Sequence, residues 1–130
     1  PKDIEWHLIG HLQSNKVKYI SPFIHTIHSV DSLDLLLEIN KQAQKHQRTI
    51  QCLLQIYIAK EETKYGLNHE EVFELFANEK LAQCVHVKIT GVMGMATNTN
   101  DYEQVRSEFI GLHTFYQKLK SEITHPIVQW

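Results

Sequence analysis

Hydrogen-bonding side chains are concentrated in the short stretch that follows Gly10. An apolar run over residues 6–9 ends at this glycine, and the next residues include His11, Gln13, Ser14, Asn15 and Lys16. A surface loop holds polar groups without burying them, and binding residues are frequent on loops that a rigid scaffold positions. The stretch is therefore a candidate ligand-binding loop.

Two lysines could take part in binding or in covalent chemistry. Lys16 and Lys64 could each bind an anion or form a Schiff base with a carbonyl compound. Taken alone, each is better interpreted as a solvated loop lysine, and Glu61 and Glu62 as solvated carboxylates. Neither GxGxxG nor GxxxxGK[ST] occurs in the chain, so a nucleotide-binding loop is not indicated.

Four histidines in the first part of the chain raise the question of a metal site. They are His7, His11, His25 and His28, and His7 and His11 could share one face of a strand. The chain has no HExxH motif and no carboxylate pair at the matching spacing. A neutral histidine is easily satisfied by ordinary hydrogen bonds. We therefore expect no metal site.

The spacing of apolar residues predicts four strands, each followed by a helix. The strands are expected over residues 4–9, 23–29, 49–59 and 85–96. The helices are expected over residues 14–20, 31–46, 69–78 and 102–123, with Asp31 and Asn68 as N-caps. The last helix is expected to bury Val105, Phe109, Leu112, Phe115, Tyr116 and Leu119. Residues 127–130 have the composition of a further strand.

Repeated β-α units predict an α/β fold, with a parallel sheet and helical crossovers. Such folds bind ligands in the loops at the carboxyl ends of the strands. Those ends are expected at residues 10–11, 29–31, 59–64 and 93–97. Ser29 and Met93 lie there, and Gly91 and Gly94 could let a flat ligand approach the backbone. No linker divides the chain, so residues 1–130 are expected to form a single, partial domain.

Composition excludes several function classes. The 130 residues are 42% hydrophobic and 22% charged, with a formal net charge of -2. No basic stripe indicates nucleic-acid binding. No apolar run approaches the roughly 18 residues of a membrane span. Cys52 and Cys84 form no CxxC motif and are expected to be buried, reduced thiols of a cytosolic protein.

Several motifs together resemble one family closely. The pattern W-H-x-I-G-x-L-Q-x-N-K is matched over residues 6–16, and "HSVDSLDLL" over residues 28–36 resembles the segment that follows it. "LLQIYIAKEETKYG" over residues 53–66 and "ITGVMGMAT" over residues 89–97 are similar to two further segments. The family is that of the pyridoxal 5′-phosphate homeostasis proteins, whose fold is similar to the N-terminal barrel of alanine racemase.

This resemblance implies a (β/α)8 TIM barrel that carries pyridoxal 5′-phosphate as a Schiff base. In the family, the lysine lies on the first strand in a V-S-K-x-like segment. S-M-G-M-S-like and R-x-G-T-like segments hold the phosphate near the last two strands. None of these segments occurs here, so neither Lys16 nor Lys64 is given the Schiff-base role. The chain resembles strands three to six with their helices, and we expect a central fragment truncated at both ends.

The resemblance also assigns candidate contacts for the cofactor. The loop after Gly10 is expected to form one wall of the cofactor mouth, with His11, Ser29 and Met93 near the pyridine ring. Asn15 is expected to fix the loop to the helix start, although it could reach the cofactor. Tyr57 stands where the family usually has asparagine in Q-[IV]-N, so no polar contact is carried over to it.

The function implied is that of a non-catalytic, cytoplasmic carrier or regulator of pyridoxal 5′-phosphate, acting in vitamin B6 and amino-acid homeostasis. One alternative is an alanine-racemase-like enzyme, which would need acid-base groups on both faces of the reacting carbon. No clear pair is found in the sequence. A second alternative is an interaction fragment without cofactor. A partial barrel leaves open sheet edges, which favour self-association.

Overall fold

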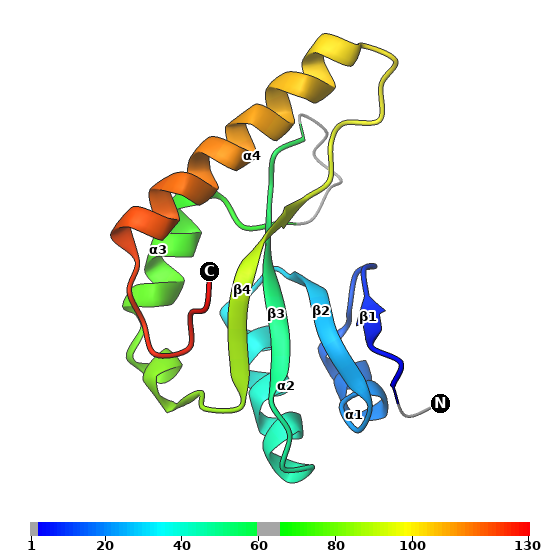
Figure 1. Cartoon of the computed structure of the whole chain (residues 1–130), viewed down its shortest axis with the longest axis vertical. Coiled ribbons are helices and arrows are strands. Elements are labelled where there is room, and N and C mark those ends of the chain that lie inside the picture. The colour runs from blue at the N-terminus through cyan, green and yellow to red at the C-terminus, as the bar shows by residue number, and fades with distance from the viewer. Residues whose placement is uncertain (1–2, 60–65) are drawn as a thin grey trace.

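Four parallel strands form the centre of the molecule, in the order β1-β2-β3-β4 (Figure 1). The computed structural model describes residues 3–59 and 66–130. The strands are β1 (Trp6–Leu8), β2 (Ile24–Val30), β3 (Ile50–Ile56) and β4 (Val87–Gly94). The α-helices are α1 (Val17–Ile20), α2 (Leu33–Lys45), α3 (His69–Ala77) and α4 (Tyr102–Glu122). The predicted order of alternating strands and helices in a parallel sheet is confirmed.

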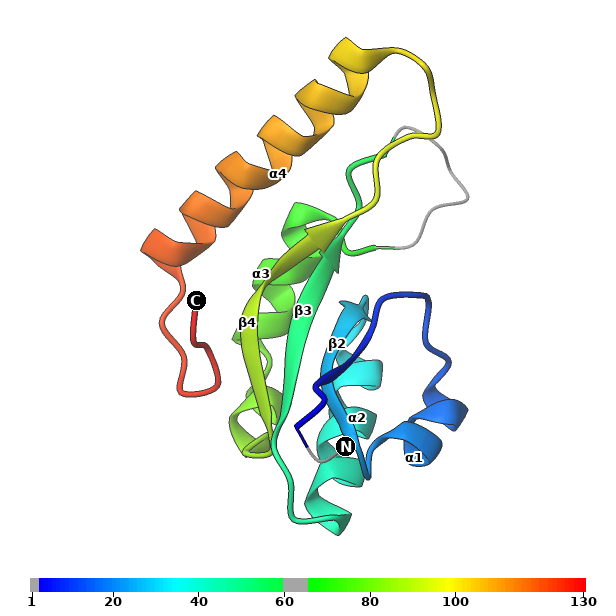
Figure 2. The same cartoon turned by 45° about the vertical axis from the view of Figure 1, so that its right-hand side comes forward.

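The helices cover one side of the sheet. Figures 1 and 2 both show α2 behind the strands, and Figure 2 shows α3 behind β3 and β4, while α4 runs diagonally alongside β4. Two short 3-10 helices complete the connections, η1 (Ser14–Lys16) before α1 and η2 (Glu79–Gln83) after α3. The core includes the fully buried side chains of Ile27, Leu36, Ile39, Leu54, Leu81, Ile89 and Leu119. Burying each of these side chains stabilises the fold by about 1.5–3 kcal/mol.

Side-chain caps fix where the helices begin. The Asn68 Oδ1 accepts from the Glu71 N–H at 2.8 Å, and the Glu71 carboxylate accepts from the Asn68 N–H at 2.9 Å, so α3 starts with a capping box. The predicted cap Asn68 is thus confirmed. The predicted cap Asp31 is wrong by one residue, because Ser32 accepts from the Leu35 N–H at 3.1 Å. Asp31 lies beside His11 instead.

The first strand is shorter and more exposed than predicted. It covers residues 6–8 rather than 4–9, and Trp6 and Ile9 are 53% and 61% exposed. Within the described part of the chain, β1 pairs with β2 alone, so it is an edge strand. Alternation of apolar residues predicts a half-buried strand, but it does not tell whether a second layer covers that face.

The inward face of α4 also differs from the prediction. Phe115 and Leu119 are buried as expected, but Phe109 is 45% exposed and Glu108 takes an inward position at 9% exposure. The predicted strand over residues 127–130 is reduced to a single bridge between Val128 and Ile89. There the Ile89 N–H donates to the Ile127 carbonyl and the Gln129 N–H donates to the Ile89 carbonyl, each at 2.8 Å.

One arginine holds the amino end of β2 against the start of β3. The Arg48 guanidinium donates to the Ser21 carbonyl, and to the Ile24 carbonyl at 2.7 Å. Arg48 lies two residues before the start of β3, and Ile24 is the first residue of β2. Hydrogen bonds from a charged donor are stronger than neutral ones, so this side chain fixes the relative position of the two strands.

Both cysteines are buried in the core. Cys52 and Cys84 are both buried and free, as expected for inert thiols. Burial raises the pKa of the Cys52 thiol and of the Cys84 thiol, which keeps both protonated.

Within residues 3–59 and 66–130, no helix combines the length and the hydropathy that crossing a bilayer requires.

Candidate functional site

The sequence predicts the candidate site at the carboxyl ends of the strands. Ser29 is the penultimate residue of β2, and Met93 is the penultimate residue of β4. The two residues belong to strands separated by β3, a span of roughly 10 Å across the sheet. His11 lies in the loop that follows β1. Three of the four predicted contacts therefore lie on elements that converge at one edge of the sheet.

His11 is held by an acidic residue from the next strand-to-helix loop. Its Nδ1 lies 3.6 Å from a carboxylate oxygen of Asp31. The Asp31 side chain is only 15% exposed, whereas that of His11 is 38% exposed. The pairing orients the imidazole while leaving part of the ring open to solvent. His11 thus lies next to Asp31, and part of its ring is reached by solvent.

The buried hydroxyl of Ser29 is a candidate hydrogen-bonding group for a ligand. Its side chain is fully buried, and its hydroxyl is the one buried side-chain polar atom of the described residues without a hydrogen-bond partner. An orphaned buried hydroxyl costs about 1–3 kcal/mol. The hydroxyl is closed off from solvent here, so a ligand would reach it only after neighbouring side chains move. Such an atom at the end of a parallel strand is compatible with a polar ligand.

The glycines of β4 serve packing. A Cβ on Gly94 would lie 2.8 Å from the Ile58 Cδ1 and 3.0 Å from the Leu112 Cδ2. The missing side chain therefore lets α4 and the end of β3 approach β4 closely. On Gly91, a Cβ would meet only the Leu53 side chain, at 3.3 Å. The space beside both glycines is taken up by side chains of the protein itself. The expected approach of a flat ligand to these glycines therefore gains no support.

Asn15 lies apart from the other candidates. It belongs to η1 and lines a hollow with Glu38 and Gln42 of α2, on the helical side of the sheet. Lys16, its neighbour, is exposed and its ammonium lies 6.0 Å from the centre of the Tyr19 ring. The assignment of Asn15 to the cofactor therefore stays a prediction. Lys64, Glu61 and Glu62 lie outside the described residues.

Tyr57 departs from the family pattern and faces the helices. It follows the end of β3 and lines a hollow with His69, Ser107, Glu108 and others around α3 and α4. Its backbone N–H donates to the Leu67 carbonyl at 2.9 Å. The phenol thus borders a hollow between the end of β3 and α4.

Glu108 anchors the loop after β4, and sequence reasoning missed it. Its carboxylate accepts from the Thr97 N–H and from the Thr97 hydroxyl, each at 2.7 Å, and from the Gln104 amide at 3.2 Å. The loop between β4 and α4 is thereby tied down at the carboxyl end of the sheet. A signal was present, because position 108 is seven residues before the buried Phe115 and so shares its face of the helix.

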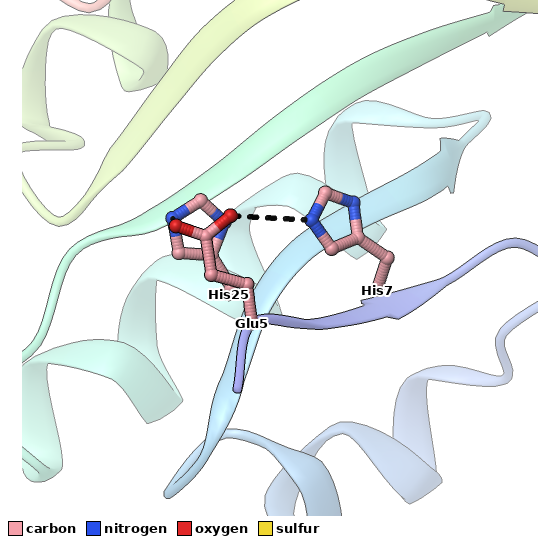
Figure 3. Close-up of side chains that lie close together, drawn as sticks. All are labelled: Glu5, His7 and His25. Carbon is pink, nitrogen blue, oxygen red and sulfur yellow. Dashed lines mark ion pairs between the residues drawn. The ribbon is translucent and has the colours of Figure 1, made fainter. Parts of the chain in front are cut away.

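Three histidines cluster along the first two strands. His7 Nε2 and His25 Nε2 lie 3.9 Å and 3.6 Å from the Glu5 carboxylate (Figure 3). His7 Nδ1 also lies 2.9 Å from His28 Nε2. Burial lowers the pKa of His28, and His7 adds to this effect. From the sequence alone, His7 and His11 are considered as residues that could share one face of a strand. The structure instead groups His7 with Glu5, His25 and His28.

The chain matches a known family over nearly its whole length. Residues 3–129 match the family model described as alanine racemase, N-terminal domain. The chain is 38% identical over 120 residues to a pyridoxal phosphate homeostasis protein of Aquifex aeolicus, covering 92% of this chain and 52% of that protein. The chain spans about half the length of the curated relatives it matches.

Solved structures agree with this match. The structure of PipY from Synechococcus elongatus with PLP bound superposes with a TM-score of 0.80 at 28% identity, covering 92% of this chain and 54% of that one. An alanine racemase of Clostridium difficile superposes with a TM-score of 0.65 at 15% identity, covering 98% of this chain and 34% of that one. The second likeness concerns the fold alone. The predicted fold, part of an alanine-racemase-like barrel, is confirmed.

Proposed function

The chain belongs to the alanine racemase N-terminal domain family, and from this premise we propose that it is part of a pyridoxal 5′-phosphate-binding protein. Its role is that of a non-catalytic carrier or regulator in vitamin B6 and amino-acid homeostasis, in the cytoplasm. The observation that carries the proposal is the likeness to PipY, whose structure was solved with PLP bound. Relatives named pyridoxal phosphate homeostasis protein support the same role.

The residues at the carboxyl edge of the sheet fit part of such a cofactor. Ser29 offers a hydroxyl without a protein partner, and His11 offers a ring fixed by Asp31. Met93 offers an apolar, polarisable side chain suited to an aromatic ring. Asn15 is the fourth proposed contact. Pyridoxal 5′-phosphate supplies an aldehyde that condenses with amines, together with a phosphate. The described residues would bind and orient its ring.

Replacing Ser29 tests this site by two effects of opposite sign. Ser29→Ala removes a buried hydroxyl that has no partner, so the free energy of unfolding should rise by about 1 kcal/mol. The same change should weaken cofactor binding about 3- to 10-fold, because a hydrogen bond to the ligand is lost. Urea unfolding measures the first effect. Equilibrium dialysis with pyridoxine 5′-phosphate, which lacks the aldehyde and cannot react with surface lysines, measures the second.

Controls separate the site from general effects. Ser121→Ala changes an exposed serine on α4 and should leave binding unchanged. His11→Ala should weaken binding by a similar factor to Ser29→Ala. Failure of the unchanged chain to bind the vitamer would contradict the proposed function. Equal affinity of both variants and the unchanged chain would remove Ser29 and His11 from the site.

A non-catalytic role distinguishes this protein from its racemase neighbours. Racemisation requires a proton donor and a proton acceptor on opposite faces of the substrate. The four proposed contacts include one side chain suited to proton transfer, that of His11. An amino-acid racemisation assay is expected to show no sustained turnover with the cofactor present. Sustained turnover would overturn the non-catalytic part of the proposal.

The exposed edge of the sheet supports a second element of the proposal, self-association of the chain. β1 pairs with β2 alone among the described strands, and Trp6 and Ile9 beside this edge are largely exposed. Edge strands with apolar neighbours pair readily with other chains. Sedimentation of the 130-residue chain is expected to show a dimer or larger species that dissociates on dilution. A monomer at every concentration would count against this element.

A further inference from the structure

Glu5, His7 and His25 converge because of the way β1 and β2 pair. Residues two apart in an extended chain point to the same side, so Glu5 and His7 lie on one face. The β1–β2 register shifts here, because Trp6 pairs with Ile24 and His7 with Thr26, so His25 is an extra residue of β2 that lies beside His7. In Figure 3 the three side chains lie together in front of β1 and β2. They are 65%, 40% and 34% exposed, so solvent reaches all of them.

Both imidazoles present the same kind of atom to the carboxylate. The Nε2 atoms of His7 and His25 lie 3.9 Å and 3.6 Å from the two oxygens of Glu5. Each ring is also held at its other nitrogen, since His7 Nδ1 lies 2.9 Å from His28 Nε2 and His25 Nδ1 lies 2.6 Å from the Thr26 hydroxyl. A ring that binds an ion through Nε2 carries its proton on Nδ1. His28 and Thr26 are placed to accept that proton in a hydrogen bond.

This arrangement has the parts of a transition-metal site. One ligand atom from each of Glu5, His7 and His25 can be chosen so that all lie within 4.8 Å of one another. Two ligands on one tetrahedral zinc ion, with bonds of roughly 2.0 Å, lie roughly 3.3 Å apart. Small side-chain rotations therefore suffice. Outer partners that orient metal-bound histidines are the usual accompaniment of such sites.

We propose that Glu5, His7 and His25 bind one divalent transition-metal ion of the zinc class. Two imidazoles and one carboxylate suit zinc and its neighbours, whereas calcium and magnesium prefer ligand sets made of oxygen alone. Water completes the coordination from the exposed side. His28 and Thr26 are positioning residues, which hold the two rings in the orientation that binding needs. His28 directly precedes Ser29 in β2, but zinc binding is measured without the cofactor, so failure of the metal site and failure of the proposed cofactor role are distinguishable.

Zinc titration of the tag-free 130-residue chain, in competition with a chromophoric chelator, tests the site. The unchanged chain is expected to bind one zinc ion. Glu5→Gln and His25→Ala should each weaken binding at least tenfold. Both residues are exposed or half-exposed, so these variants are expected to fold. His113→Ala, which removes an exposed histidine on α4, is the matched control and should retain full affinity.

Cobalt substitution adds a readout for the positioning residues. Thr26→Val should weaken zinc binding by about tenfold, and should alter the visible absorption of the cobalt-loaded chain because the His25 ring is no longer held. Absence of one-to-one zinc binding would overturn the proposal. So would equal affinity of the unchanged chain, Glu5→Gln and His25→Ala, because the ion would then be held by other surface groups.

Discussion

Gly66→Ala is expected to lower the free energy of unfolding by about 3 kcal/mol. Gly66 has a φ of 147°, a region that residues with a side chain rarely adopt. A Cβ there would lie 2.6 Å from the Tyr57 N and 2.9 Å from the Ile56 carbonyl carbon. These are backbone atoms of the end of β3, so they cannot rotate away. Urea unfolding followed by circular dichroism measures the loss.

The same glycine shapes the carboxyl end of β3. Beside it, the Tyr57 N–H donates to the Leu67 carbonyl at 2.9 Å, and the Leu67 N–H donates to the Gln55 carbonyl at 2.8 Å. Gly111→Ala is a control of opposite sign, because a Cβ there meets nothing within 4 Å and alanine favours a helix by about 1 kcal/mol. A Gly66→Ala variant as stable as the unchanged chain would contradict the close approach of Gly66 to the backbone of Ile56 and Tyr57.

Glu108→Ala is expected to cost about 3 kcal/mol and to loosen the loop after β4. Hydrogen bonds to the carboxylate include two from Thr97 and one from the Gln104 amide, and each bond to a charged acceptor contributes about 1.5–3 kcal/mol. The variant would leave the Thr97 N–H without its acceptor. Denaturant unfolding measures the stability, and hydrogen exchange at the Thr97 amide measures the order of the loop.

Two further variants separate hydrogen bonding from charge and packing. Glu108→Gln keeps the side-chain volume, and its amide oxygen can still accept from the Thr97 N–H, so its stability should fall between that of the unchanged chain and that of Glu108→Ala. Glu103→Ala makes the same chemical change at an exposed position on α4 and should cost less than 1 kcal/mol. If Glu108→Ala lost no more stability than Glu103→Ala, the anchoring role would be refuted.

The order of strands and helices could be predicted because it depends on local information. The capping box of Asn68 and Glu71 is contained within four residues, and its hydrogen bonds follow from residue type and spacing. The same reasoning missed the start of α2 by one residue. Asp31 and Ser32 are both good N-cap residues, and Asp31 is instead paired with His11, which lies on a different loop.

The parts of the site that were missed depend on contacts between distant residues. From the sequence alone, Glu108 is interpreted as a solvated helix residue, because its hydrogen bonds with Thr97 exist only in the folded chain. Likewise, Glu5 and His25 are twenty residues apart and meet only through the register of β1 on β2. That register is irregular between Trp6 and His7, and the β2–β3 register is irregular between Ile27 and Val30. Periodicity in one sequence does not reveal such shifts.

The sheet pairs each strand with its neighbour in the chain, and this order has a consequence for folding. The three registers join Trp6 to Ile24, Thr26 to Gln51 and Ile50 to Val87, so each pairing among the four described strands joins consecutive strands of the chain. The β3–β4 pairing has seven matched positions, whereas β1–β2 has three. Native-state opening should therefore begin at β1 and reach β3 and β4 last. We expect the β3–β4 unit, with the helices that flank it, to be the part of the chain that stays folded longest.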